Sequence, residues 1–111
     1  MSEERIKTYQ EFYKFYLSQH QNSICRFLHV LGTTVVLALT ITAVYHKEPK
    51  LLIMVPLAGY GFAWIGHFFF EQNKPATFQY PWWSLKSDFK MYFDILSGKI
   101  ALDNSKDHNI N

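Results

Sequence analysis

FLHVLGTTVVLALTITAVY, residues 27–45, and LLIMVPLAGYGFAWIGHFFF, residues 51–70, decide the fold of this chain. Neither stretch contains Asp, Glu, Lys or Arg, although the 111-residue chain holds nine acidic and eleven basic residues. An α-helix rises about 1.5 Å per residue, so about 20 apolar residues cross the hydrocarbon of a bilayer. The two stretches therefore predict two membrane-spanning helices, joined as a hairpin by the short loop 46–50.

Other readings of these stretches are weaker. A buried hairpin in a soluble bundle is disfavoured, because the rest of the chain is too short to cover two helices that are apolar all round. Residues 1–26 are charged and aromatic, and they do not have the apolar segment of a cleavable signal peptide. Lone Cys25 excludes an internal disulfide. The net charge of +2 is too small to indicate a nucleic-acid partner.

Amphipathic segments flank the hairpin, at residues about 3–20 and about 82–97. Apolar and aromatic residues recur at helical spacing in both segments, which is typical of helices that lie in a membrane interface. The first helix can begin at the Thr8–Glu11 capping box or at Ser2. We predict an all-α fold with one membrane domain, residues 1–100, and a disordered polar tail, residues 101–111.

The basic residues predict an orientation. In a hairpin both termini lie on one side, together with nine of the eleven Lys and Arg residues; only Lys47 and Lys50 lie in the loop. The positive-inside tendency places both termini in the cytoplasm. The expected location is the inner membrane in a bacterium or the endoplasmic reticulum in a eukaryote. A two-helix hairpin buries little protein surface, so we also expect a homo-oligomer.

Each span carries one histidine. His29 lies nineteen positions before Glu48, the centre of the loop, and His67 lies nineteen positions after it. Antiparallel helices would therefore hold both histidines at the same depth. A titratable side chain inside a membrane span is costly and indicates a function, and metal binding is the first candidate.

Two further residues extend this site. Glu71 follows His67 by four positions and shares its helix face, either as a metal ligand or as an outer partner of a ligating imidazole. His20 continues the Tyr9–Tyr13–Tyr16 row by one turn. Imidazoles with a carboxylate suit Fe(II), Zn(II) or Mn(II). Simple packing of the histidines remains open at this point.

Neighbouring residues have two interpretations each. Arg26 beside the site is a candidate for binding a substrate carboxylate or an anionic head group, and it is equally consistent with an interface anchor. Cys25 is more easily explained as a small buried residue than as a fourth ligand. His46 in the loop and His108 in the tail are expected to be solvated, as is Asp88. No glycine-rich phosphate loop or other cofactor-binding motif is present.

Two motifs give the chain a family resemblance. Phe12-Tyr13-Lys-Phe-Tyr16 is followed by His20, Asn22 and Leu28-His29, and Gly59-Tyr60-Gly61-Phe-Ala-Trp-Ile-Gly66-His67-Phe-Phe-Phe-Glu71 runs on to Pro75-Ala76. Over residues 9–100 the chain resembles a family of small membrane proteins associated with the fungal 2-hydroxy-palmitate dioxygenase of the endoplasmic reticulum. The fungal enzymes are longer, with further membrane segments between the two motifs.

The resemblance implies a function. It implies an Fe(II)-dependent dioxygenase that uses dioxygen to shorten a lipid-derived 2-hydroxy fatty acid by one carbon, as in fatty acid α-oxidation. The implied iron ligands are His20, His29 and His67. Two alternatives differ in class: a non-enzymatic membrane module that packs against a partner or lipid, and a bis-histidine haem protein formed by a dimer of hairpins.

Overall fold

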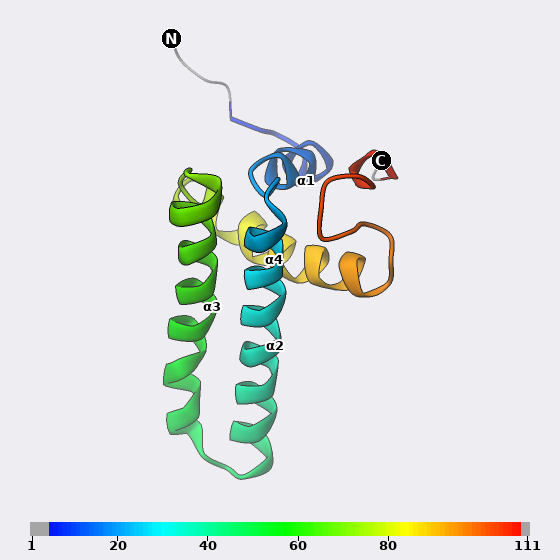
Figure 1. The fold of residues 1–111 in the computed structure, drawn as a ribbon. Coiled ribbons are helices and arrows are strands. Elements are labelled where there is room, and N and C mark those ends of the chain that lie inside the picture. The colour runs from blue at the N-terminus through cyan, green and yellow to red at the C-terminus, as the bar shows by residue number, and fades with distance from the viewer. Residues whose placement is uncertain (1–4, 110–111) are drawn as a thin grey trace.

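The computed structural model describes residues 5–109, and these form helices and turns without a strand, which confirms the all-α class. The α-helices are α1 (Tyr9–Ser18), α2 (Ser23–Tyr45), α3 (Met54–Ile65) and α4 (Pro81–Leu96). The shorter elements are the 3-10 helices η1 (Pro49–Ile53), η3 (Ala76–Phe78) and η4 (Asp107–Asn109), and the π-helix η2 (Gly66–Glu71). In Figure 1, α2 and α3 stand side by side as a hairpin, and α1 and α4 gather at the end away from its loop.

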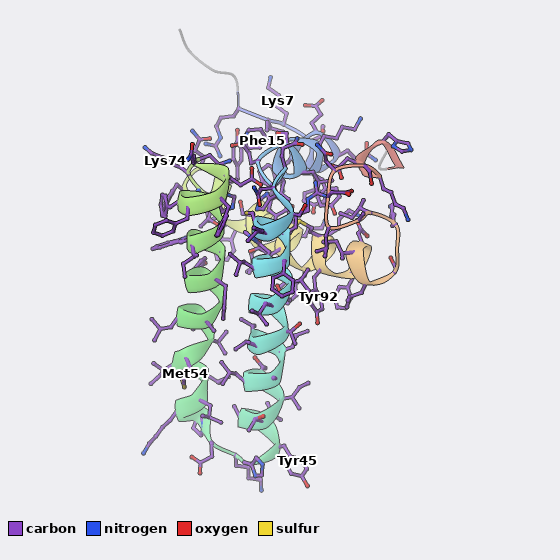
Figure 2. The ribbon with its side chains drawn as sticks, viewed as in Figure 1. Lys7, Phe15, Tyr45, Met54, Lys74 and Tyr92 are labelled. Atoms are coloured by element: carbon purple, nitrogen blue, oxygen red, sulfur yellow. The ribbon has the colours of Figure 1, made fainter. Side chains whose placement is uncertain are left out.

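The hairpin has the dimensions of two membrane spans. Ser23–Tyr45 and Pro49–Glu71 each comprise 23 residues and are long and apolar enough to cross a membrane. Most of their surface is not covered by the rest of the chain, and Leu57 on α3 is 71% exposed. Figure 2 shows side chains projecting outward along the hairpin as far as Tyr45 and Met54, near the loop. Apolar surface of this extent marks a contact with a membrane or a protein.

Small residues allow α2 and α3 to approach one another. A Cβ atom placed on Gly32 of α2 would lie 3.0 Å from the Cβ of Phe62, and one placed on Gly59 of α3 would lie 3.3 Å from Cγ2 of Val36. Helices in lipid associate through such close packing, since lipid supplies no hydrophobic drive. These contacts hold the two helices at a fixed register and therefore set the relative level of their histidines.

Side-chain caps decide where the first two helices begin. Thr8 Oγ1 accepts a hydrogen bond from the Glu11 amide at 3.2 Å, so α1 begins at Tyr9 and not near residue 3. The alternative cap, Ser2, lies outside the described residues. Asn22 Oδ1 accepts from the Ile24 amide at 2.8 Å and starts α2 before the predicted span. These caps also fix the short linker between α1 and α2.

The buried core of the described residues lies between α1 and α4. We call these two helices, together with the core between them, the platform. Its central side chains are Phe12, Tyr13, Tyr16, Leu17, Tyr80, Met91 and Ile100. Polar bonds align the two helices: the Tyr13 hydroxyl donates to Asp94 Oδ2 at 2.8 Å, and the hydroxyls of Tyr9 and Ser87 lie 2.9 Å apart. The aromatic row of α1, which the sequence assigns to a membrane interface, therefore packs against protein.

An apolar row of α4, formed by Trp82, Leu85, Phe93 and Leu96, faces outward. Trp82 is 78% exposed and Leu96 is 61% exposed, whereas Ser84 and Ser87 on the opposite face are buried. An amphipathic helix with this orientation suits a membrane interface. The buried serine face is covered because α1 lies against it. This covering places Asp88, which the sequence suggests is solvated, in a partly buried position.

The C-terminal residues contact the platform and α2. Residues 101–111 read as a disordered polar tail, but residues 101–109 form turns and the short helix η4. Arg26 of α2 holds this segment: its guanidinium donates to Asp107 and to the carbonyl oxygens of Ala101 and Asp103. Composition alone cannot reveal an anchor that lies 81 positions away in the chain.

Candidate metal centre

Three histidines converge where the hairpin meets the platform. His20 comes from the linker between α1 and α2, His29 from α2 and His67 from η2. All three are buried; their side chains expose 1%, 6% and 2% of their surface, respectively. Their ring centroids lie 4.4–5.1 Å apart, with the ring planes close to perpendicular. The structure thus brings together the three histidines that the sequence predicts as ligands.

Each imidazole is oriented by an acceptor at its Nδ1 atom. His20 Nδ1 lies 2.6 Å from the carbonyl oxygen of Tyr16, and His29 Nδ1 lies 2.8 Å from that of Cys25. A carbonyl oxygen can only accept, so Nδ1 must carry the hydrogen in both rings. Nε2 is then the unprotonated atom, and this tautomer is the one that binds a metal through Nε2.

The orientation of His67 depends on Asn73, a residue that the sequence does not single out. Asn73 Oδ1 lies 2.7 Å from His67 Nδ1, and Asn73 Nδ2 donates to the carbonyl oxygen of Gln19 at 3.1 Å. Because the amide nitrogen is committed to Gln19, the amide oxygen must face His67 and accept from it. His67 therefore also presents Nε2 to the centre. Asn73 lies six residues after His67, a spacing that no helical periodicity predicts.

The separation of the ligand atoms fits one metal ion. His20 Nε2 and His29 Nε2 lie 3.1 Å apart. Two nitrogens at 2.0–2.1 Å from one ion and at right angles around it would be about 3.0 Å apart. Two unprotonated nitrogens at this distance repel each other unless a cation lies between them. The adjoining pocket has a volume of about 10 Å³, which is the size of one water molecule or ion.

Burial keeps the His20 imidazole neutral. Burial lowers the pKa of His20 well below its usual range, and neighbouring His29 and His67 lower it further. The Tyr16 ring stacks on the His20 ring with centroids 4.0 Å apart. The neutral imidazole that results is the form that binds a metal ion.

Local backbone structure turns His67 toward the centre. Residues 66–71 form a π-helix and not the continuous α-helix that the sequence predicts, and Gln72 ends it in the left-handed conformation with φ 57°. Such segments often occur at functional sites because they re-aim side chains. A glycine is required at its start: a Cβ atom on Gly66 would lie 2.9 Å from Cys25 Sγ.

Glu71 and Cys25 occupy the edge of the centre. Glu71 Oε2 accepts from the Asn22 amide at 2.5 Å, and the carboxylate lies near the Cys25 thiol. Its carboxylate lies outside the cluster of histidine ligand atoms, whereas Cys25 Sγ lies within 4.8 Å of them. The sulfur lies 3.8 Å from Nδ1 of His29, which is not the nitrogen that faces the centre. Glu71 thus ties the end of η2 to the start of α2.

Arg26 is engaged within the chain. It is 0% exposed; besides the C-terminal contacts, its Nε donates to the carbonyl oxygen of His20 at 2.6 Å. Its guanidinium pairs with Asp107 through two bonds of 3.0 and 2.7 Å. Arg26, which the sequence suggests for binding a substrate carboxylate, thus pairs with a carboxylate of the chain itself. His46 and His108 are exposed and do not belong to the histidine cluster.

Two residues of α4 complete the surroundings. Ser84 and Asp88 line the small pocket together with the three histidines. Tyr16 donates its hydroxyl to Asp88 Oδ1 at 2.5 Å. Burial raises the pKa of Asp88 to about 7, and the hydrogen bond from Tyr16 opposes part of this rise. Their spacing of four residues places both on one helix face, but only the packing of α1 on α4 identifies that face as buried.

The geometry defines an all-helical protein with a hairpin of membrane-spanning length and a buried histidine cluster of metal-binding geometry at one end. Residues 6–100 match the family model described as 2-hydroxy-palmitic acid dioxygenase Mpo1-like. The chain belongs to this Mpo1-like family, which confirms the resemblance seen in the two motifs. Comparisons with curated proteins and with solved structures give no match.

Proposed function

We propose that the protein is a membrane-embedded, Fe(II)-dependent dioxygenase that removes one carbon from 2-hydroxy fatty acids. The convergence of three imidazoles, each with Nδ1 committed to an acceptor and Nε2 left for the centre, carries this proposal. Family membership supports the reaction class and the fatty acid substrate. Three histidines leave coordination positions open, as in oxygen-activating iron sites.

The proposed ligands are His20, His29 and His67, and Fe(II) bound there would supply the redox chemistry that activates dioxygen. The net reaction consumes one dioxygen and one 2-hydroxy acid and gives CO2, water and the acid shorter by one carbon. Atoms and electrons balance without an external reductant, because the hydroxyl carbon, oxidised to the new carboxyl carbon, and the carboxyl carbon, released as CO2, together supply the four electrons that dioxygen takes up. The chain must therefore hold the ligands, exclude water and position the acid.

The surrounding residues suit these tasks. The carbonyl oxygens of Tyr16 and Cys25 and the Asn73 amide hold the imidazoles in place. Tyr16 covers one face of His20 and, with the aromatic core of the platform, separates the centre from water. Glu71 stabilises the junction of η2 and α2, and we assign it this supporting role.

A membrane location agrees with such a substrate. The exposed hairpin surface and the outward apolar row of α4 support a placement in which the hairpin spans the bilayer and α4 lies at its interface. We further propose cytoplasmic termini, because nine of the eleven Lys and Arg residues lie at the platform end. The centre would then lie at the membrane boundary, where a fatty acid presents its polar end.

The haem alternative has little support in the geometry. In a dimer of hairpins each chain would present a histidine to the shared haem, whereas His20, His29 and His67 are only 1%, 6% and 2% exposed. The adjoining pocket of about 10 Å³ also has no space for a porphyrin ring. No specific observation favours the non-enzymatic module.

Iron binding and turnover test the proposal together. The full chain is purified in detergent without oxygen, reconstituted with Fe(II) and exposed to oxygen with 2-hydroxypalmitic acid. We expect one iron per chain, no Soret band and an acid shorter by one carbon. His20→Ala, His29→Ala and His67→Ala should each lose iron, whereas His46→Ala, exposed at the far end, should retain it. Iron-loaded wild type without product would contradict the proposal, as would equal iron loss in all four variants.

A further inference from the structure

An apolar cavity of about 190 Å³ adjoins the histidine centre between α2, α3 and α4. Thr33 and Val36 line it from α2, Pro56 and Gly59 from α3, and Phe89 from α4. A cavity with this lining excludes water and favours an apolar ligand. The small residues that let α2 and α3 approach one another therefore also leave an apolar space beside their contact.

The cavity and the small histidine pocket lie side by side. They share four lining residues, which are His29, Tyr60, Ala63 and Asp88. From His29 to Val36 the cavity follows seven residues of α2, or about 10 Å along the helix. Its titratable lining residues, His29 and Asp88, lie at the histidine end, and Thr33 lies one turn further along α2. A ligand that lies in the cavity with its polar end at these shared residues, beside the ion-sized histidine pocket, has an apolar chain that runs into the span.

Ser84 supplies independent evidence for a polar ligand. Its side chain is 1% exposed and lines the histidine pocket. Among the described residues, its Oγ is a buried side-chain atom without a hydrogen-bond partner. Leaving a buried hydroxyl unpaired is costly, so such an atom indicates a partner that binds in the pocket. Asp88, one turn further along α4, presents a carboxylate to the same pocket.

We infer that Ser84, Asp88 and this cavity form the binding subsite for the 2-hydroxy fatty acid, an inference that rests on the proposed function. The Ser84 hydroxyl donates to the carboxylate of the acid, and the Asp88 carboxylate accepts from its 2-hydroxyl. The first carbons of the chain occupy the cavity. Asp88 thereby distinguishes a 2-hydroxy acid from the unsubstituted acid, which offers no donor to it.

The cavity volume sets the length of chain that is recognised. An apolar cavity of about 150 Å³ holds benzene, so about 190 Å³ accommodates roughly seven or eight chain carbons. Each methylene buried there raises affinity by a factor of roughly four. We expect kcat/KM to rise from 2-hydroxyhexanoic to 2-hydroxydecanoic acid and then to level off, because later carbons of the chain lie in lipid.

Two glycines of α3 give a matched pair of variants. Gly59 lines the cavity, whereas a Cβ atom on Gly61 meets nothing within 4 Å. Gly59→Leu should fill the cavity and lower kcat/KM for 2-hydroxyoctanoic and longer acids by about tenfold or more, with 2-hydroxyhexanoic acid least affected. Unchanged iron content shows that its contact with Val36 has not shifted the histidines. Gly61→Leu should behave as wild type. Val36→Ala should enlarge the cavity and move the plateau to longer chains. Iron content and Tm confirm that each variant is folded.

The polar end of the subsite has its own controls. Ser84→Ala should raise KM about tenfold without lowering Tm, because its hydroxyl has no partner to lose. Ser87→Ala, which loses a bond to Tyr9 outside the pocket, should lower Tm and leave KM unchanged. Asp88→Asn should reduce the preference for the 2-hydroxy acid over the unsubstituted acid in a competition assay. An unchanged KM in Ser84→Ala would overturn the assignment of Ser84.

Binding without turnover separates this inference from the proposed function. A 2-hydroxy fatty acid with a mid-chain diazirine is cross-linked to the protein, and the labelled residues are mapped by peptide mass spectrometry. Labels on Val36, Gly59 or Phe89 support the subsite even if no product forms, in which case only the proposed reaction fails. Labels confined to outward residues such as Leu57, in a protein that does turn over the acid, would overturn the subsite and leave the reaction standing.

Discussion

Gly66 and Cys25 lie so close that a Cβ atom on the glycine would be 2.9 Å from the cysteine sulfur and 3.2 Å from its Cα. The second contact is to backbone, which cannot move aside as a flexible side chain can. Gly66 begins η2 and precedes His67, while Cys25 holds the Nδ1 atom of His29 through its carbonyl oxygen. The distance between two of the proposed ligands therefore depends on this contact.

Gly66→Ala should loosen the metal centre. The added methyl forces η2 away from α2 and separates His67 from His29, at a cost of about 1–3 kcal/mol for overpacking. We expect a lower Tm and substoichiometric iron by elemental analysis after anaerobic loading. Gly61→Ala, whose Cβ meets nothing within 4 Å, is the control and should retain full iron. Full iron occupancy in Gly66→Ala would show that the contact does not set the ligand spacing.

Asn73→Ala should weaken metal binding without removing a ligand. Its amide oxygen fixes the orientation of His67, and loss of an outer partner of this kind lowers metal affinity by roughly 10–100-fold. Titration with Fe(II) or Co(II) under nitrogen measures the change. Asn104→Ala, which loses a surface contact with Gln21, should bind the metal as wild type does. Equal affinities in all three proteins would remove Asn73 from the site.

Asp88 should make stability depend on pH. Its pKa in the folded protein is about 7, compared with 3.8 for the unperturbed group, so folding favours its protonated form. This contribution to stability is fully present below about pH 4 and is lost as the pH rises through about 7. Between pH 5 and pH 8 the Tm of the metal-free protein should fall more in wild type than in Asp88→Asn. The asparagine retains an acceptor for Tyr16. Parallel Tm curves for the two proteins would contradict this origin of the pH dependence.

Arg26→Gln should release the C-terminal segment. The substitution leaves the Asp107 carboxylate without its partner and frees the carbonyl oxygens of Ala101 and Asp103. Breaking a buried pair from one side costs about 3–5 kcal/mol, although part of Asp107 is exposed and the loss should be nearer the lower value. Limited proteolysis should cut residues 101–109 faster than in wild type. Lys90→Gln, which removes a partly exposed pair with Asp94, should leave the cleavage rate unchanged.

Sequence patterns predict the hairpin and the histidines for a clear physical reason. A bilayer tolerates no charge at its centre without cost, so the two uncharged stretches identify the spans. Antiparallel geometry then converts sequence distance from the loop into depth, which brings His29 and His67 together. His20 follows from the aromatic row of α1, even though that row packs against α4 and not against the membrane.

The remaining site residues depend on tertiary packing. The π-helix changes the direction of His67 and Glu71, so their spacing of four does not place both side chains at the metal. Asn73 reaches His67 only because Gln72 turns the chain in the left-handed conformation. Asp88 and Ser84 lie on the polar face of an amphipathic helix, where solvent is the usual neighbour. In this protein α1 packs against that face of α4 and covers it.

The outward apolar row of α4, beside a hairpin whose surface also faces outward, bears on how the proposed enzyme meets its substrate. A fatty acid dissolved in the same leaflet can reach the cavity between α2, α3 and α4 by lateral diffusion, without passing through water. The quantity that sets the reaction rate is then the mole fraction of the acid in the bilayer and not its bulk concentration. Adding inert lipid at constant total substrate should slow the reaction by surface dilution.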